Sequence, residues 1–70
     1  MATKATSETL KKVADDEPIF VLRGQDRLAS VIVREWAGLA AMNGCPDEKV
    51  KEAYDCAEAM DNWPTRKLPD

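Results

Sequence analysis

Apolar residues recur at three- and four-residue spacing in two stretches of this chain, a period typical of amphipathic helices. The first stretch predicts a helix that begins at Asp26 or Ser30 and ends at Asn43. The second predicts a helix that begins at Pro46 and ends at about Asn62. Because so few residues separate the two helices, we expect them to be antiparallel neighbours. The predicted fold class is all-α, with an antiparallel two-helix hairpin at its centre.

The residues between the two stretches fit the end of one helix and the start of another. Asn43 and Gly44 are typical of a left-handed helix cap, because glycine adopts positive φ at no steric cost. Pro46 suits a first helical position, and Asp47 and Glu48 place negative charge in the first turn, where the helix dipole favours it.

The first helix carries more apolar surface than one neighbour would cover. One stripe holds Leu28, Ile32, Trp36 and Leu39 and ends at Asn43, and a second holds Val33, Ala37, Ala40 and Ala41. The second helix has a single stripe of Val50, Ala53, Tyr54, Ala57 and Met60. An apolar surface as wide as that of the first helix predicts a homo-oligomer, with Trp36 in the core or in the interface between subunits.

The segments outside the helices are polar or extended. Residues 1–16 predict a flexible N-terminal arm, with a transient turn from Glu8, because few of their side chains can be buried. Residues 17–70 are expected to form a single helical-hairpin domain with an extended C-terminal tail. Residues 18–22 form a short apolar run after a proline, which we expect to lie extended over the hairpin, as a strand or as coil. Gly24 is then expected to permit a sharp turn.

Size and charge restrict the function classes. Seventy residues allow one domain, and a chain this short usually needs a staple or a partner subunit. The net charge of −3 is the wrong sign for a general nucleic-acid binder, and we expect no sequence-specific DNA partner. No apolar run is long enough for a membrane span or a signal peptide, which predicts a cytoplasmic protein without a membrane partner.

Residues suited to catalysis or to metal binding are scarce. The chain has no histidine and only two cysteines, which disfavours a structural zinc site and excludes a Ser-His or Cys-His pair. Cys45 and Cys56 would lie roughly 16 Å apart along a helix, too far for a disulfide. We therefore expect a protein that is not an enzyme and that needs no cofactor and no metal.

Two clusters outside the helices have side chains suited to binding. Arg23, Gln25 and Arg27 follow the apolar run, where guanidinium groups suit phosphate or carboxylate. The alternative is that Arg23 pairs with an acidic residue of the second helix and that Gln25 belongs to a capping turn.

The second cluster lies after the second helix. Trp63 offers an aromatic platform, and Arg66 and Lys67 offer cations, a combination suited to a base and its phosphate. The alternative is that Trp63 packs on the end of the hairpin and that the tail is merely polar. Phe20 is a second aromatic side chain that we expect to face a base.

Three segments resemble a group of small, uncharacterised proteins encoded by phages and prophages. They are residues 18–26, 33–37 and 60–70, within a resemblance that spans about 17–70. The resemblance implies a phage origin, and therefore the host cytoplasm, but no established activity.

Together these features predict a non-enzymatic binding protein. Its ligand would be a small anion such as a cyclic nucleotide defence signal. The alternative is a protein-protein inhibitor of a host factor, or a small assembly factor.

Overall fold

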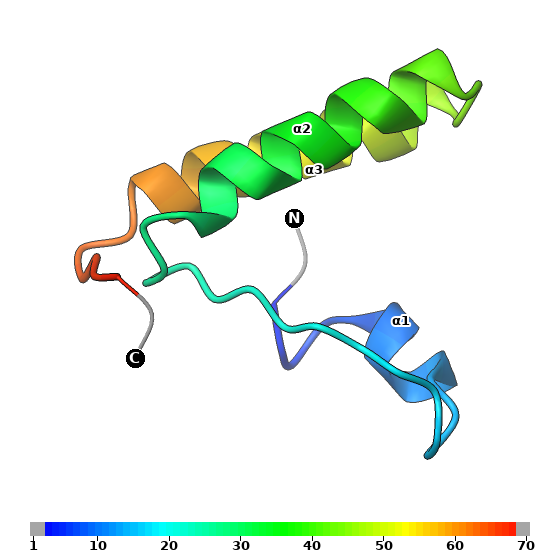
Figure 1. Cartoon of the computed structure of the whole chain (residues 1–70), viewed down its shortest axis with the longest axis horizontal. Helices are drawn as coiled ribbons and strands as arrows, with labels where there is room; N and C mark the ends of the chain where they lie inside the picture. Colours follow the sequence, from blue (N-terminus) through cyan, green and yellow to red (C-terminus); the bar gives the residue numbers. More distant parts are fainter. Residues whose placement is uncertain (1–2, 69–70) are drawn as a thin grey trace.

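The structure is a computed structural model and describes residues 3–68 of the chain. It contains three helices, α1 (Glu8–Lys12), α2 (Ala29–Met42) and α3 (Asp47–Asp61), and residues 3–68 include no strand (Figure 1). The all-α prediction is confirmed for this part of the chain. The last two residues of the predicted tail, Pro69 and Asp70, lie outside the described residues, as do residues 1–2 of the predicted arm.

The arm contains a short helix in place of the turn expected from Glu8. The Ser7 hydroxyl accepts a hydrogen bond of 3.3 Å from the backbone N–H of Leu10, which satisfies one of the N–H groups left over at the start of a helix. Lys11 pairs with Glu8 across one turn at 3.3 Å. These local contacts stabilise α1, in which no residue is buried.

The apolar run at residues 18–22 is coil, and it does not cover the helices as expected. Phe20 is 88% exposed, and Ile19 and Val21 are also exposed, whereas Leu22 is half-buried. Figure 1 shows this segment leading from α1 toward the start of α2. Without a neighbouring strand the run has no ladder of hydrogen bonds, and its apolar side chains remain largely in solvent.

The start of α2 differs from both predicted start points. Asp26 does not cap the helix directly: its Oδ1 accepts a 2.8 Å hydrogen bond from the N–H of Leu28, which forms a turn just before Ala29. Ser30 is no cap either, because it lies inside α2 and is buried. The helix thus begins between the two predicted caps, directly after the Asp26 turn.

The end of α2 is the left-handed cap that the sequence predicts. Gly44 has a φ of +80°, and its N–H donates to the carbonyl oxygen of Ala41 at 3.2 Å. The N–H of Cys45 donates to the carbonyl oxygen of Ala40 at 3.0 Å. This pair of bonds is the Schellman motif, which satisfies two carbonyl groups at the helix end.

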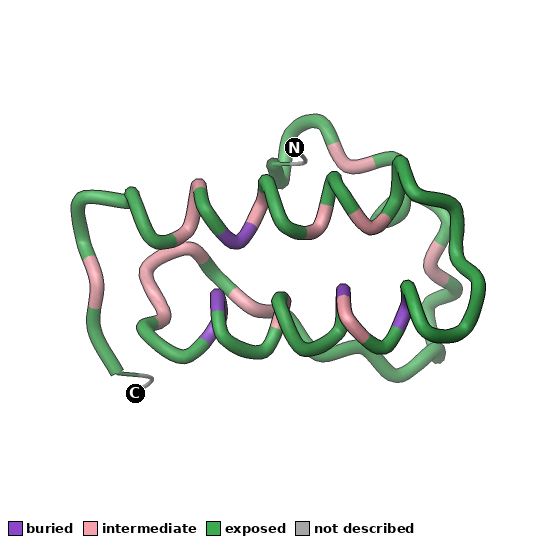
Figure 2. Tube along the Cα trace, turned by 90° about the horizontal axis from the view of Figure 1, so that it is seen from above, coloured by how far each residue is buried: buried purple, intermediate pink, exposed green. Residues whose placement is uncertain are grey.

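α2 and α3 lie side by side, joined at one end by residues 43–46 (Figure 2). Within residues 3–68, the buried apolar residues are all alanines: Ala29, Ala37, Ala40 and Ala57. Small side chains let the two backbones approach closely. They also bury little apolar area, so the free energy gained from this core is small.

The large apolar side chains lie outside this core. One of the two stripes predicted for the first helix, which begins at Leu28 just before α2, remains about half exposed: Leu28 (51% exposed), Ile32 (47%), Trp36 (54%) and Leu39 (58%). We call these four residues the outer stripe. Trp36 is therefore not a core residue within the chain, contrary to one of the two predicted locations. The other predicted stripe, which includes Ala37 and Ala40, is the one that faces α3.

The polar face of α3 agrees with the sequence pattern. Its charged residues Lys49, Lys51, Glu52, Asp55, Glu58 and Asp61 are exposed. Lys51 and Asp55 form an ion pair across one turn at 2.6 Å. Within residues 3–68, none of the helices combines the length and the apolar character needed to cross a membrane.

Candidate functional site

The two predicted binding segments lie against each other at the open end of the α2/α3 pair. An isolated parallel bridge joins Asp26 to Lys67. It consists of two backbone hydrogen bonds: the N–H of Lys67 donates to the carbonyl oxygen of Gln25 at 2.7 Å, and the N–H of Arg27 donates to that of Lys67 at 2.8 Å. The turn before α2 and the tail after α3 thus form one local surface.

Arg23 and Arg27 contribute the exposed charge of this surface. Both residues are exposed, and neither has an ion pair or a side-chain hydrogen bond within residues 3–68. The alternative in which Arg23 pairs with an acidic residue of α3 is therefore wrong. Unpaired cations in a protein with a net charge of −3 mark a place where an anion would be attracted.

Arg66 has a different environment, because its guanidinium group holds the end of α3. Nη1 donates to the carbonyl oxygen of Met60, one of the carbonyl groups that have no partner within the helix. Nη2 donates to the carbonyl oxygen of Asp26 at 3.4 Å, and Nη1 lies 3.6 Å from the Asp61 carboxylate. With 21% of its side chain exposed, Arg66 links the tail, the turn and α3.

Asp61 is the acidic centre of these contacts. Its Oδ2 accepts a 2.6 Å hydrogen bond from Nη2 of Arg34, which joins α3 to α2. Hydrogen bonds from Ser30 and from Arg34 lower the pKa of Asp61 below its usual value, and the charge of Arg66 acts in the same direction. The buried Ser30 hydroxyl thereby has a polar partner across the helix interface.

Trp63 packs against the turn while most of its surface is exposed. A Cβ atom built on Gly24 would lie 3.7 Å from Cγ of Trp63, so the indole covers this glycine in van der Waals contact. Trp63 is 56% exposed, which leaves part of the ring accessible. Gly24 does not have positive φ, so the turn does not depend on glycine for the reason that the sequence suggested.

Gln25 and Phe20, the two uncharged residues of the predicted site besides Trp63, have different environments. Gln25 is half-buried and takes part through its backbone carbonyl in the bridge to Lys67. Phe20 lies five residues earlier on the coil, with 88% of its surface exposed. The lining of the neighbouring groove, described next, does not include it.

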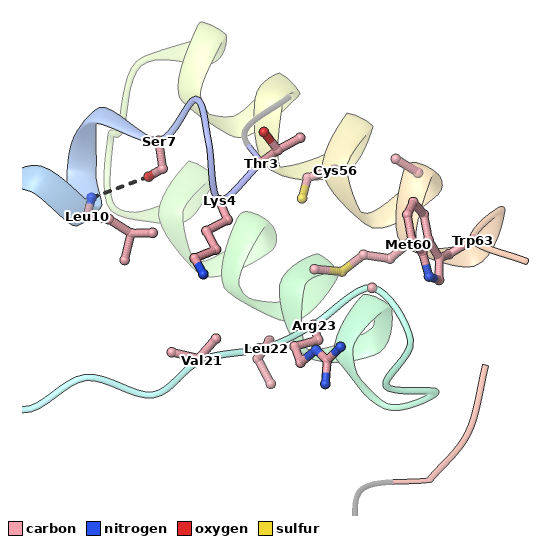
Figure 3. A pocket seen from close by; sticks show the side chains of 12 residues that line it. Thr3, Lys4, Ser7, Leu10, Val21, Leu22, Arg23, Cys56, Met60 and Trp63 are labelled. Atoms are coloured by element: carbon pink, nitrogen blue, oxygen red, sulfur yellow. Dashed lines mark hydrogen bonds between the residues drawn. The ribbon is translucent and has the colours of Figure 1, made fainter. Parts of the chain in front are cut away.

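A groove of about 710 Å³ opens beside Arg23 and Trp63 (Figure 3). Three parts of the chain line it: the arm, the segment of residues 21–24 and the second half of α3. Its lining consists of Thr3, Lys4, Ser7, Leu10, Val21, Leu22, Arg23, Gly24, Cys56, Ala59, Met60 and Trp63. We call it the arm groove.

Sequence reasoning missed most of the arm groove. Lys4 and Leu10 belong to the polar N-terminal arm. This arm has no regular spacing of apolar residues, so the sequence does not predict which part of the protein it contacts. Met60 was assigned only to the apolar stripe of the second helix, which does not indicate that it lines a groove. The available signal was the apolar character of Leu10 in an otherwise polar arm.

The described residues offer no site for a metal: no group of three or more acidic, cysteine or histidine side chains could hold an ion within residues 3–68. Cys45 and Cys56 are free thiols, the first exposed and the second half-buried in the wall of the arm groove. The side chains that this surface exposes include cations and one indole ring.

Comparisons of the chain with protein-family models, with curated proteins and with solved structures found no match. The resemblance to small phage-encoded proteins therefore stays a prediction, and the case for a function rests on the geometry.

Proposed function

We propose that this protein is a non-enzymatic binding protein that sequesters a small anionic ligand, such as a cyclic nucleotide used as a defence signal by a host. The main support is the pair of unpaired guanidinium groups, Arg23 and Arg27, on a turn that is held against the tail by the bridge to Lys67. A planar guanidinium forms two parallel hydrogen bonds to a phosphate, which makes arginine well suited to this ligand class.

Each predicted site residue has a part in this proposal. Arg23, Arg27 and Lys67 would contact phosphate groups, and the exposed part of the Trp63 ring would stack on a base. Gln25 and Phe20 would contribute from the turn and from the coil before it. Arg66 would act indirectly, since its donors hold the carbonyl groups of Met60 and Asp26 and its charge is opposed by Asp61.

The proposed functional form is an antiparallel hairpin assembled into a homo-oligomer. Within residues 3–68 the buried apolar residues are four alanines, whereas the outer stripe exposes about half of each of four large side chains. Interfaces of homo-oligomers bury surfaces of this apolar character. A second copy covering the outer stripe would supply apolar burial that the single chain lacks.

Calorimetry against cyclic AMP, cyclic di-AMP and ATP tests the ligand class. Arg23→Ala combined with Arg27→Ala removes both unpaired guanidinium groups, and charge-assisted hydrogen bonds contribute about 1.5–3 kcal/mol each. We expect binding to weaken at least about 100-fold and to weaken further with added salt. The matched control, Lys12→Ala with Lys49→Ala, removes the same charge from exposed positions away from the site. If no nucleotide binds below about 100 μM, the proposal fails.

The second candidate is a protein-protein inhibitor or assembly factor, and the outer stripe is the observation that favours it. A stripe at three- and four-residue spacing is what one amphipathic helix presents to a groove or to another helix. Ile32→Glu would place a charge in this stripe, which would abolish docking of a partner protein and leave Arg23 and Arg27 in place. An activity lost in Ile32→Glu and kept in the Arg23/Arg27 double variant would support this candidate.

A further inference from the structure

The arm groove has an uneven distribution of charge. Of its twelve lining residues, Lys4 and Arg23 are the charged ones, and both are cations. They come from two separate parts of the chain, Lys4 from the arm and Arg23 from the segment after the apolar run. Figure 3 shows Lys4 extending from the arm toward the segment that carries Val21 and Leu22. A groove with two cations and no acidic residue in its described lining is complementary to an anion.

The remaining lining is mainly apolar and includes one aromatic ring. Leu10, Val21, Leu22 and Met60 line its apolar part, and Trp63 lies beside Met60 (Figure 3). A volume of about 710 Å³ is within the range of small-molecule sites. A flat base would find a ring to stack on and a flexible thioether to pack against. The occupant that fits both the charge and the apolar surface is an anion with a flat apolar part, which is the composition of a nucleotide.

Neither cation is held by an acidic residue. Lys4 and Arg23 have no ion pair within residues 3–68. By contrast, Lys11 of the same arm pairs with Glu8, and Arg34 and Arg66 pair with Asp61. The two cations of the groove are thus available to a ligand, whereas these other cations already have acidic partners.

We propose that residues 3–10 of the arm form the third wall of the anion site, and that Lys4 holds a phosphate group opposite Arg23. This inference rests on the proposed function and adds to it a binding residue and a location for the base. The base lies in the arm groove against Trp63 and Met60, and the phosphate lies between the two cations. The arm then determines affinity and not folding, since among the described helices only α2 and α3 pack on each other.

The test compares Lys4→Ala with Lys12→Ala in the full chain, using calorimetry with cyclic AMP, cyclic di-AMP and ATP. Both variants remove one positive charge from the arm, but Lys12 does not line the groove. We expect Lys4→Ala to weaken binding about tenfold or more, the effect of one lost hydrogen bond to a charged group. Lys12→Ala is expected to bind as the wild type does.

The reactivity of Cys56 provides a second measurement of binding in the arm groove, because its half-buried thiol lines this groove. In a Cys45→Ser background, which removes the exposed thiol, a bound nucleotide should slow alkylation of Cys56 by a maleimide. The same nucleotide should protect Cys56 less in Lys4→Ala at equal concentration.

The outcomes separate the two proposals. If nucleotide binds the wild type while Lys4→Ala equals Lys12→Ala, or while Cys56 stays unprotected at saturation, the arm is no part of the site and the proposed function stands without it. If no nucleotide binds the wild type, both proposals are overturned.

Discussion

The backbone N–H of Arg27 donates a hydrogen bond of 2.8 Å to the carbonyl oxygen of Lys67. Forty residues separate these two positions in the sequence, and both helices of the α2/α3 pair lie between them. The bond therefore closes the open end of the pair and gives the tail a defined place beside the turn.

Lys67→Pro tests whether this backbone bridge organises the site. Proline has no N–H, so the 2.7 Å bond from residue 67 to the carbonyl oxygen of Gln25 is lost. We expect faster hydrogen exchange at the N–H of Arg27, because loss of the first bond weakens the second bond of the bridge, from this N–H to the carbonyl oxygen of residue 67. Lys67→Ala keeps the backbone donor and is the matched control. Equal exchange rates in the two variants would mean that the bridge does not hold the tail.

Arg66→Ala should destabilise the fold, in contrast to Arg23→Ala. The guanidinium of Arg66 caps the carbonyl oxygen of Met60 and reaches that of Asp26, and a part-buried side chain with such contacts contributes about 1–2 kcal/mol. Arg23 has no described partner, so its truncation should leave the free energy of unfolding unchanged within about 0.5 kcal/mol. Urea denaturation followed by circular dichroism measures both. Equal stability of the two variants would contradict the assigned role of Arg66.

Sequence reasoning could predict α2, α3 and the cap that ends α2 because their signals are local, whereas it did not predict α1 as a helix or the start of α2. The Asn43-Gly44 cap and the charged face of α3 depend only on neighbouring residues. It could not predict that the apolar run at 18–22 would stay exposed, because strand formers need a second strand that this chain does not provide in its described part.

The residue types of the candidate site were predictable, but not which side chains are exposed and which are held by contacts within the protein. Arg23, Arg27, Trp63 and Lys67 were identified by residue type and by their location outside the helices. The guanidinium group of Arg66 contacts Met60 and Asp61 because the tail turns back toward α3. The spacing of residues along the sequence does not predict this turn. Lys4 was missed because nothing in a polar arm indicates which part of the chain it will approach.

The two glycines at turns should respond differently to alanine. Gly44 has a φ of +80°, which L-residues rarely adopt, so Gly44→Ala should cost about 1 kcal/mol. Gly24 lacks positive φ, and an added Cβ would meet the Trp63 ring at an ordinary 3.7 Å, so Gly24→Ala should be nearly neutral. Urea denaturation of the two variants gives the comparison, and a larger loss in Gly24→Ala would contradict the described turn.

The stability of the fold should depend on the ionisation of Asp61. Its pKa is lowered from 3.8 in the folded state by hydrogen bonds from Ser30 and Arg34. A carboxyl whose folded pKa is depressed stabilises the protein above the unfolded pKa, and this stabilisation is lost as the pH falls through the folded value. The difference in unfolding free energy between wild type and Asp61→Asn should therefore be constant near neutral pH and shrink below about pH 4. A difference that is independent of pH down to pH 2 would refute this.

Self-association through the outer stripe predicts that stability depends on protein concentration. A melting temperature that rises with concentration is the mark of folding linked to assembly. Trp36 is 54% exposed in the single chain, so Trp36→Ala leaves no internal cavity and should act on the assembly instead. Loss of its burial in an interface should cost about 2 kcal/mol per subunit.

Sedimentation across a range of micromolar concentrations measures this loss directly. Trp36→Ala should shift the distribution toward smaller species, whereas Phe20→Ala, which truncates a side chain that is 88% exposed on the coil before α2, should not. If the wild-type protein sediments as a folded monomer at every concentration, with a constant melting temperature, the small core around the four alanines is sufficient to stabilise a single chain. The outer stripe would then need a different partner.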